Sequence, residues 1–197
     1  MIVLWIVIGL IALVAIGYVV SYNRFVRQRN LVQESWRQID VELTRRHDLI
    51  PNLVETVKGY AAHERTVLEA VTAARTTAIT AVGTAGPAAQ AQAENALGRS
   101  LGGLFAVAEN YPTLKADTNF LELQRQLAET EDRIAAGRRF YNGNVRALNT
   151  RIEAFPSSVV ANMGHFTPAE YFETEDPAVR APVTVDFGSL GSAGGHA

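Results

Sequence analysis

Few side chains in this sequence of 197 residues have types and spacings that could do chemistry. A helical protein can hold a di-metal centre, but such a centre needs Glu-x-x-His pairs on two helices. None of the four histidines has a glutamate three residues before it, so we expect no metal ligands. Cysteine is absent, which excludes disulfides and thiolate chemistry. The histidines are His47, His63, His165 and His196.

Signatures of other active sites are missing as well. The sequence has no Gly-rich phosphate loop, no nucleophile elbow and no kinase motif. A formal net charge of −2 and the lack of a basic face argue against a nucleic-acid partner. We therefore predict no catalytic, cofactor-binding or metal-binding residues, no cofactor, and a protein that is not an enzyme.

Polar residues on otherwise apolar helical stripes are the remaining candidates for a site. A buried charge is costly unless it is paired. Arg46 is therefore expected either to extend its guanidinium to water or to pair with an acid such as Glu131 on a facing helix. The alternative is a ligand-sensing pocket inside the helices, lined by Arg46, Glu64 and Tyr141. The polar positions on these stripes are Arg46 and Glu64 on the first, and Thr130 and Asn144 on the last.

The elements that must position these residues begin with an apolar run at residues 1–20. About 20 apolar residues suffice to cross a bilayer core. No Lys or Arg precedes the run and no small-residue cleavage site follows it, which argues against a cleaved signal peptide. Arg24, Arg27 and Arg29 come next, and the positive-inside rule places them in the cytoplasm. We predict a single-pass protein of the inner (cytoplasmic) membrane, with residues 1–21 as transmembrane anchor, the N-terminus outside and the C-terminal domain cytoplasmic.

The rest of the chain has apolar residues spaced three or four apart, which is typical of helices. We predict an all-α fold in which residues 22–156 form an antiparallel, up-down four-helix bundle with long helices. Gly83 and Gly86-Pro87 end the first long stripe, because glycine and proline mark helix ends and starts. The later helices are predicted at residues 88–109 and 119–155, the last with a capping box of Asn119 and Glu122 and a stop at Pro156.

Pro51 lies within the first stripe and allows two interpretations. A proline inside a helix costs about 3 kcal/mol, whereas a break with Asp48 as N-cap would place Pro51 in a first turn at little cost. Against the break, the apolar spacing runs through Pro51 without a slip. We favour the break, which gives four soluble helices, the first continuous with the anchor. Residues 45–48, Arg-Arg-His-Asp, would then form a contact surface or would balance the partial charges at the helix ends.

Residues 157–187 are predicted to contain a short helix and an extended segment. Thr167-Pro168-Ala169-Glu170 has the form of a capping box with proline at the first helical position, so a helix to about Thr174 is expected. The alternation in Val183-Thr184-Val185 indicates extended backbone. Residues 188–197 have the composition of a flexible tail.

The segment from Val159 to Phe172 carries more apolar surface than a linker needs. It has no Lys or Arg, which weakens the case for docking on lipid. Packing on its own bundle is the default, and a neighbouring subunit is the alternative, because the anchor concentrates chains in two dimensions. We predict a homo-oligomer in which this segment and Val183 to Phe187 touch an adjacent chain.

Six segments of the sequence resemble a known family. They are Arg45 to Val54, Glu55 to Glu64 (ETVKGYAAHE), Glu109 to Ala116, Glu129 to Ile134, Arg138 to Asn142, and Phe155 to Ser157. On these segments the chain resembles the LemA family, from the anchor to Phe187. The resemblance implies a bacterial protein with a short segment outside, one membrane span and a cytoplasmic four-helix bundle. It implies no known enzyme activity and supplies no catalytic residues.

Members of this family are often encoded near membrane metalloproteases or other envelope proteins. The resemblance thus implies a membrane metalloprotease or another envelope protein as partner, in envelope quality control. Our leading hypothesis is a membrane-anchored, non-enzymatic scaffold or adaptor that self-associates and binds a membrane partner. The alternative is a ligand sensor. A cavity at Arg46, Glu64 and Tyr141 would favour the sensor, and a filled core with apolar surface stripes the scaffold.

Overall fold

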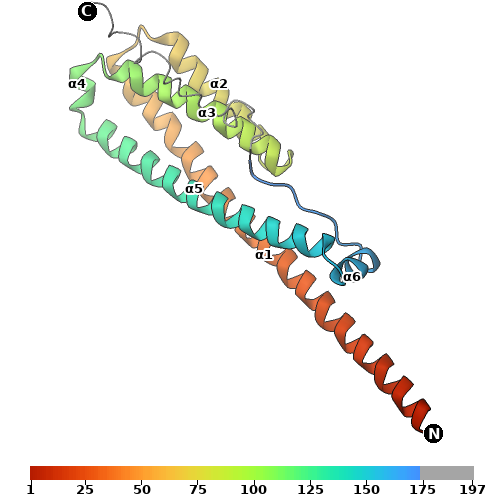
Figure 1. The fold of residues 1–197 in the computed structure, drawn as a ribbon. Coiled ribbons are helices and arrows are strands. Elements are labelled where there is room, and N and C mark those ends of the chain that lie inside the picture. The colour runs from red at the N-terminus through yellow and green to blue at the C-terminus, as the bar shows by residue number, and fades with distance from the viewer. Residues whose placement is uncertain (174–197) are drawn as a thin grey trace, which may run out of the picture.

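The computed structural model describes residues 1–173, in which every regular element is a helix (Figure 1). The predicted all-α class is thereby confirmed. The extended stretch predicted at Val183 to Phe187 and the tail at residues 188–197 lie outside the described residues. The helices are α1 (Ile2–Tyr60), α2 (Arg65–Ala81), α3 (Pro87–Ala108), α4 (Pro112–Lys115), α5 (Thr118–Glu153) and α6 (Ser157–Met163).

Helix α1 is one continuous helix of 59 residues that includes Pro51, so the predicted break is wrong. Proline has no backbone N–H. The carbonyl of His47, four residues before Pro51, therefore lacks its helical hydrogen-bond donor. Arg75 of α2 supplies a donor instead, because its Nε lies 2.7 Å from the His47 carbonyl oxygen. The uninterrupted apolar spacing across Pro51 was therefore the better signal.

The first third of α1 extends beyond the other helices (Figure 1). Its apolar side chains, from Ile2 to Val20, are almost all exposed. Among residues 1–173, α1 contains the one helical stretch that is long and apolar enough to cross a membrane. The same helix then enters the folded core at Phe25, whose side chain is fully buried. The apolar run and the first core residues are therefore parts of one helix.

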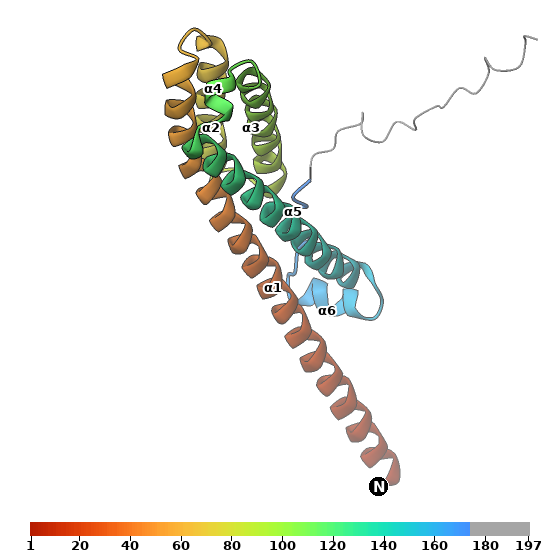
Figure 2. The same cartoon turned by 90° about the vertical axis from the view of Figure 1, so that its left-hand side faces the viewer.

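The four long helices pack as two antiparallel pairs (Figures 1 and 2). Helix α5 lies along the middle and distal parts of α1, while α2 and α3 pair with each other. The α2–α3 pair lies only beside the end of α1 that is remote from the N-terminus. The predicted four-helix bundle is not confirmed, because the four long helices do not run side by side along the whole domain. The part of the fold near the apolar run contains α1, α5 and α6 without α2 or α3.

Two clusters of buried apolar residues form the core. The distal cluster joins α1, α2, α3, α4 and α5 and includes Ile50, Leu53 and Leu97. The proximal cluster, nearer the apolar run, joins α1 and α5 to the segment after α5 and, through Ala91, to the start of α3. It includes Phe25, Leu43 and Ile134. Leu43 and Ile50 thus belong to different clusters, and the residues between them on α1 lie at the boundary.

The start of α5 differs from the prediction. Its N-cap is Asp117, whose side chain accepts a hydrogen bond of 2.9 Å from the backbone N–H of Phe120. The predicted capping box of Asn119 and Glu122 is therefore wrong. Asp117 also accepts a hydrogen bond of 2.9 Å from the hydroxyl of Tyr60, which ties the start of α5 to the end of α1. Two partners thus favour Asp117 as the cap.

The helix predicted to start at Thr167 is also wrong. The chain forms α6 directly after Pro156, and residues 166–173 contain no helix. The side-chain amide of Asn149 exchanges two hydrogen bonds with the backbone of Ala169, at 2.9 and 3.0 Å. Asn142 does the same with Phe172, at 2.9 and 3.3 Å. These amides bind the backbone groups of Ala169 and Phe172 while the segment runs extended along α5.

The spacing of these partners explains the fit. Asn142 and Asn149 are seven residues apart on a helix, about 10.5 Å along its axis. Ala169 and Phe172 are three residues apart in extended backbone, about 10 Å. The side chains of Phe166 and Phe172 are consequently buried within this chain. Packing on the same bundle, the default expected from the sequence, accounts for both rings.

Candidate functional site

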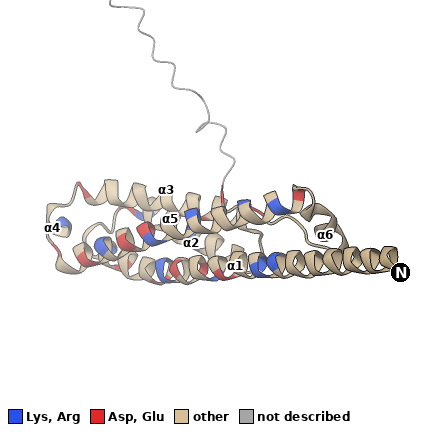
Figure 3. Cartoon of the chain, turned by 60° about the horizontal axis from the view of Figure 1, so that its bottom comes forward, with Lys and Arg blue, Asp and Glu red and all other residues tan. Residues whose placement is uncertain are grey.

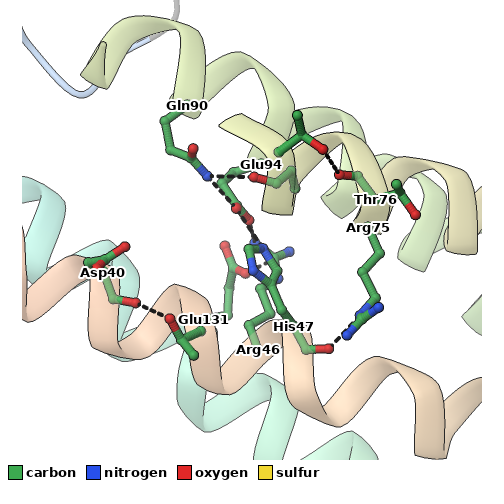
Figure 4. Close-up of polar contacts among 11 residues, drawn as sticks. Asp40, Arg46, His47, Arg75, Thr76, Gln90, Glu94 and Glu131 are labelled. Atoms are coloured by element: carbon green, nitrogen blue, oxygen red, sulfur yellow. Dashed lines mark hydrogen bonds and ion pairs between the residues drawn. The ribbon is translucent and has the colours of Figure 1, made fainter. Parts of the chain in front are cut away.

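A layer of buried polar side chains separates the two apolar clusters. We call Arg46, His47, Gln90 and Glu94 the polar layer (Figure 4). Arg46 and His47 follow Leu43 and precede Ile50 on α1, and Gln90 and Glu94 lie one turn apart on α3. All four residues are buried, and they make up most of the buried polar residues among residues 1–173.

Glu94 is the centre of the polar layer. Its Oε1 lies 2.8 Å from His47 Nε2 and 2.9 Å from Gln90 Nε2, and its Oε2 lies 3.4 Å from Arg46 Nη1. A carboxylate that is ionised can only accept hydrogen bonds, so its contact with His47 requires the tautomer that carries a proton on Nε2. Glu94 on α3 is thereby bound to two neighbouring residues of α1.

Arg46 extends the polar layer to a third helix. Its Nη2 lies 3.1 Å from Oε2 of Glu131 on α5, a carboxylate at the surface. The guanidinium thus meets one buried and one exposed acid. Charged groups that are taken out of water are tolerated when they are paired and hydrogen-bonded in this way. The layer consequently links α1, α3 and α5 at one level of the fold.

Gln90 joins the layer to α2. Its Nε2 donates to Glu94 and, at 3.3 Å, to the backbone carbonyl of Ala78. Its Oε1 is buried and has no hydrogen-bond partner among the described residues. Together with the bond from Arg75 to the His47 carbonyl, these contacts tie the α2–α3 pair to α1. The polar layer therefore acts as a cross-link between helices.

Few charged atoms of the layer are free to bind a ligand. The two terminal nitrogens of Arg46, Nη1 and Nη2, and both oxygens of Glu94 already face protein partners. Within residues 1–173, no group of three or more His, Cys, Asp or Glu side chains is placed to hold a metal ion. The chemistry that this geometry supports is pairing between helices.

The sequence anticipates one part of this site and misses another. Of the two alternatives for Arg46, pairing with an acid such as Glu131 is the one that the structure confirms. The role of Glu94 was missed, although a signal for it exists. Glu94 precedes Leu97, Leu101 and Leu104 at spacings of three, four and three, which places it on the buried stripe of α3. His47 was missed because Arg46 alone was assigned to the buried stripe.

The structure does not gather Arg46, Glu64 and Tyr141 into one pocket. Glu64 lies in the turn after α1 and accepts a hydrogen bond of 3.2 Å from the Tyr111 hydroxyl. The ring of Tyr141 packs against Trp36, which is ten residues before Arg46 on α1 and so about 15 Å away along the helix. The three residues thus lie at three levels of the fold.

Tyr141 has a structural role of its own. Its hydroxyl donates a hydrogen bond of 2.8 Å to the backbone carbonyl of Glu170. Burial raises the pKa of Tyr141 to about 12, and the charge of Glu170 adds to the increase, so the hydroxyl keeps its proton. Thr130, one of the two polar positions predicted on the α5 stripe, is fully buried. Its hydroxyl donates a hydrogen bond of 2.8 Å to the backbone carbonyl of Gln126.

Comparison with known proteins identifies relatives of this fold. Magnetosome protein MamQ 1 and Magnetosome protein MamQ 2 of Paramagnetospirillum magneticum are each 29% identical to this chain over 201 residues. Each match covers 90% of this chain and 73% of the relative. Magnetosome protein MamQ of Magnetospirillum gryphiswaldense is 27% identical, with the same coverage. The sequence model of the LemA family matches residues 35–187, which include the polar layer. The chain therefore belongs to the LemA family.

Proposed function

We propose that this protein is a membrane-anchored, non-enzymatic scaffold that holds a helical domain at a fixed height above the bilayer. The observation that carries the proposal is the continuity of α1 from Ile2 to Tyr60. A flexible linker would allow the domain to turn freely, whereas one helix that is both anchor and core fixes its direction. From Arg24 to Tyr60 the helix rises about 54 Å.

The contacts of the polar layer support a scaffold over a ligand sensor. The layer's charges are paired with one another across α1, α3 and α5. Such pairing favours one register of the helices, since a shift would leave buried charges unpaired. A sensor needs polar groups that are free to bind a ligand. We accordingly propose that the four long helices act as one rigid antiparallel unit.

We further propose that the domain is cytoplasmic and that it binds other copies of itself and a membrane partner. Arg24, Arg27 and Arg29 follow the apolar run and favour the cytoplasmic side. A membrane metalloprotease or another envelope protein is the partner we favour. The names of the MamQ relatives refer to a cellular structure, the magnetosome, and not to an enzymatic activity, which supports a structural role.

The orientation is tested by placing a single cysteine at Glu153, an exposed residue at the end of α5, since the chain has no other cysteine. An impermeant thiol reagent should label this variant only after the cells are lysed. A second variant with a cysteine before Ile2 should be labelled in intact cells once any outer membrane is permeabilised. The reverse pattern would overturn the proposed orientation.

Self-association is tested by producing two full-length copies with different tags in the same cells. Purification through one tag in mild detergent should recover the other copy together with any bound membrane protein. Membranes that each contain one tagged copy, mixed after lysis, are the control and should yield little of the second tag. Recovery of single chains alone would contradict the scaffold proposal.

A further inference from the structure

An open groove lies where the apolar run of α1 passes the end of α5 and α6. Its volume is ≈ 1450 Å³, which exceeds the roughly 300–1,000 Å³ of usual small-molecule pockets. One wall is α1 from Ile11 to Arg24, and the other is formed by α5 from Gly143 onward and by α6. Most of the lining is aliphatic, and neither wall contributes an Asp or a Glu.

The charged part of the lining has one sign. Arg24, Arg146 and Arg151 are its three charged residues. None of them forms an ion pair with an acid among residues 1–173, although nine other ion pairs form there. Figure 3 shows that the first basic residues of α1 follow directly on its uncharged N-terminal run. Three arginines that have no ion pair within residues 1–173, beside an apolar groove, are complementary to a ligand with an anionic head and an apolar tail.

The groove spans the boundary of the bilayer if α1 is anchored as proposed. Ile11 lies near the middle of the apolar run and Arg24 just past its end, about 20 Å further along the helix. The inner half of the run would therefore face the acyl chains of one leaflet, and the arginines would lie at the headgroups. Phe155, Val159 and Met163 at the other wall are exposed, although they are apolar. Lipid contact would cover these side chains.

We propose that this groove binds an anionic phospholipid of the cytoplasmic leaflet. Its phosphate binds Arg24, Arg146 and Arg151, because guanidinium groups pair with phosphate oxygens through two parallel hydrogen bonds. Its acyl chain lies along the aliphatic wall of α1. The site rests on the proposed membrane anchoring of α1 and adds a specific lipid to it.

Sequence reasoning missed this site because its parts are distant in the chain. The segment from Val159 to Phe172 has no Lys or Arg, which weakened the case for lipid docking. The fold supplies the missing charges from α1 and from the end of α5. A basic face built by two helices gives no periodic signal in either of them.

The test uses the full-length protein in nanodiscs made of equal parts phosphatidylglycerol and phosphatidylcholine. Native mass spectrometry of the released protein counts the lipids that stay bound and identifies their headgroups. The groove variant is Arg24→Gln, Arg146→Gln and Arg151→Gln. The matched control, Arg99→Gln, Arg138→Gln and Arg139→Gln, removes three exposed arginines that do not line the groove. Circular dichroism checks that all variants keep their helix content.

The unmodified protein should retain phosphatidylglycerol over phosphatidylcholine by about tenfold or more, since each arginine near an anionic headgroup adds to the preference. The groove variant should lose this preference and the control should keep it. Ala147→Trp, which fills the groove at an exposed alanine, should retain less of both lipids. An unchanged preference in the groove variant, or an equal loss in the control, would overturn the lipid site.

Two further outcomes separate this site from the anchor and from a protein partner. If carbonate washing removes the unmodified protein from vesicles, both the anchor and the lipid site fail. If the protein resists washing but shows no headgroup preference, only the lipid site fails. A lipid-free dimer that Ala147→Trp converts to a monomer would show that a second copy occupies the groove, which also overturns the lipid site.

Discussion

The Nε of Arg75 donates a hydrogen bond of 2.7 Å to the backbone carbonyl of His47, the carbonyl that Pro51 leaves without its helical partner. One side chain of α2 thus compensates for a proline in α1. The His47 side chain meanwhile binds Glu94 on α3. A single residue of α1 is in this way held by both members of the α2–α3 pair, at the point where the helix would otherwise be weakest.

This relationship predicts a strong coupling between Arg75 and Pro51. Arg75→Ala should lower the free energy of unfolding by about 1–3 kcal/mol, because it leaves the His47 carbonyl without a donor. In a Pro51→Ala background the alanine N–H can donate to the same carbonyl, so the loss should be much smaller. Urea unfolding of the four proteins in mild detergent gives the coupling energy. Equal losses in both backgrounds would show that Arg75 does not replace the missing helical donor.

Glu94, at the centre of the polar layer, should contribute far more to the free energy of unfolding than Glu131 at the surface. Glu94→Gln should destabilise the protein by about 3–5 kcal/mol, the range for removing one partner of a buried ion pair. Glu131→Gln is the matched control, since the side chain of Glu131 is 57% exposed, and should cost at most about 1 kcal/mol. Thermal unfolding followed by circular dichroism measures both. Similar losses at the two sites would mean that Arg46 depends on its surface partner as much as on its buried one.

Helical spacing placed Arg46 on a buried stripe, and the need to pair a buried charge suggested an acid such as Glu131 on a facing helix as its partner. Sequence reasoning could not identify the whole layer. Whether Glu94 meets Arg46 and His47 depends on how the α2–α3 pair docks against α1, and that contact is not encoded in the spacing of any one helix. The break at Pro51 failed for a related reason. The donor that compensates for the proline lies 28 residues away, at Arg75.

The asparagines of α5 should control the extended segment. Asn149→Ala removes both hydrogen bonds to Ala169 and should speed amide hydrogen exchange in residues 166–173. Asn149→Asp keeps the acceptor for the Ala169 N–H but replaces the donor with a carboxylate oxygen that faces the Ala169 carbonyl, so it should not restore protection. Asn162→Ala, at an exposed position on α6, is the control. Unchanged exchange in Asn149→Ala would mean that the aromatic contacts alone hold the segment.

The bond between Tyr60 and Asp117 should make stability depend on pH at both extremes. The backbone N–H of Phe120 and the Tyr60 hydroxyl hold the pKa of Asp117 below its usual value of 3.8, so this stabilisation is present above that value and is lost as pH falls through the lowered pKa. The hydrogen bond to Asp117 raises the pKa of Tyr60 above 10.0, so the same contribution is lost as pH rises through the raised pKa.

Melting temperatures of the unmodified protein and of Tyr60→Phe test this window. The difference between them should be present near pH 7. It should shrink as the pH falls below the usual Asp value of 3.8 and as the pH rises above the usual Tyr value of 10.0. Tyr171→Phe serves as a control, because the Tyr171 hydroxyl has no hydrogen bond to a described residue. A difference that stays constant across this range would exclude the Tyr60–Asp117 bond as its source.

The fold could be predicted where the local sequence pattern determines the secondary structure. It could not be predicted where side chains distant in the sequence bind the backbone of a segment. The apolar run, the all-α class and the buried stripe of α5 follow from composition and from 3–4 spacing. The segment from Thr167 to Glu170 shows the limit. Its capping box favours a helix locally, but Asn142 and Asn149 bind the backbone groups of Ala169 and Phe172. Tertiary hydrogen bonds therefore override the local preference.

The continuity of α1 is tested most directly by a distance between two spin labels on its exposed face in proteoliposomes. Asn23→Cys and Gly59→Cys place the only two cysteines 36 residues apart, ten helical turns, so both labels point the same way. The account predicts one narrow distribution centred near about 54 Å. A broad distribution, or one centred below about 45 Å, would mean that α1 bends or breaks between Asn23 and Gly59, and the rigid scaffold would be contradicted.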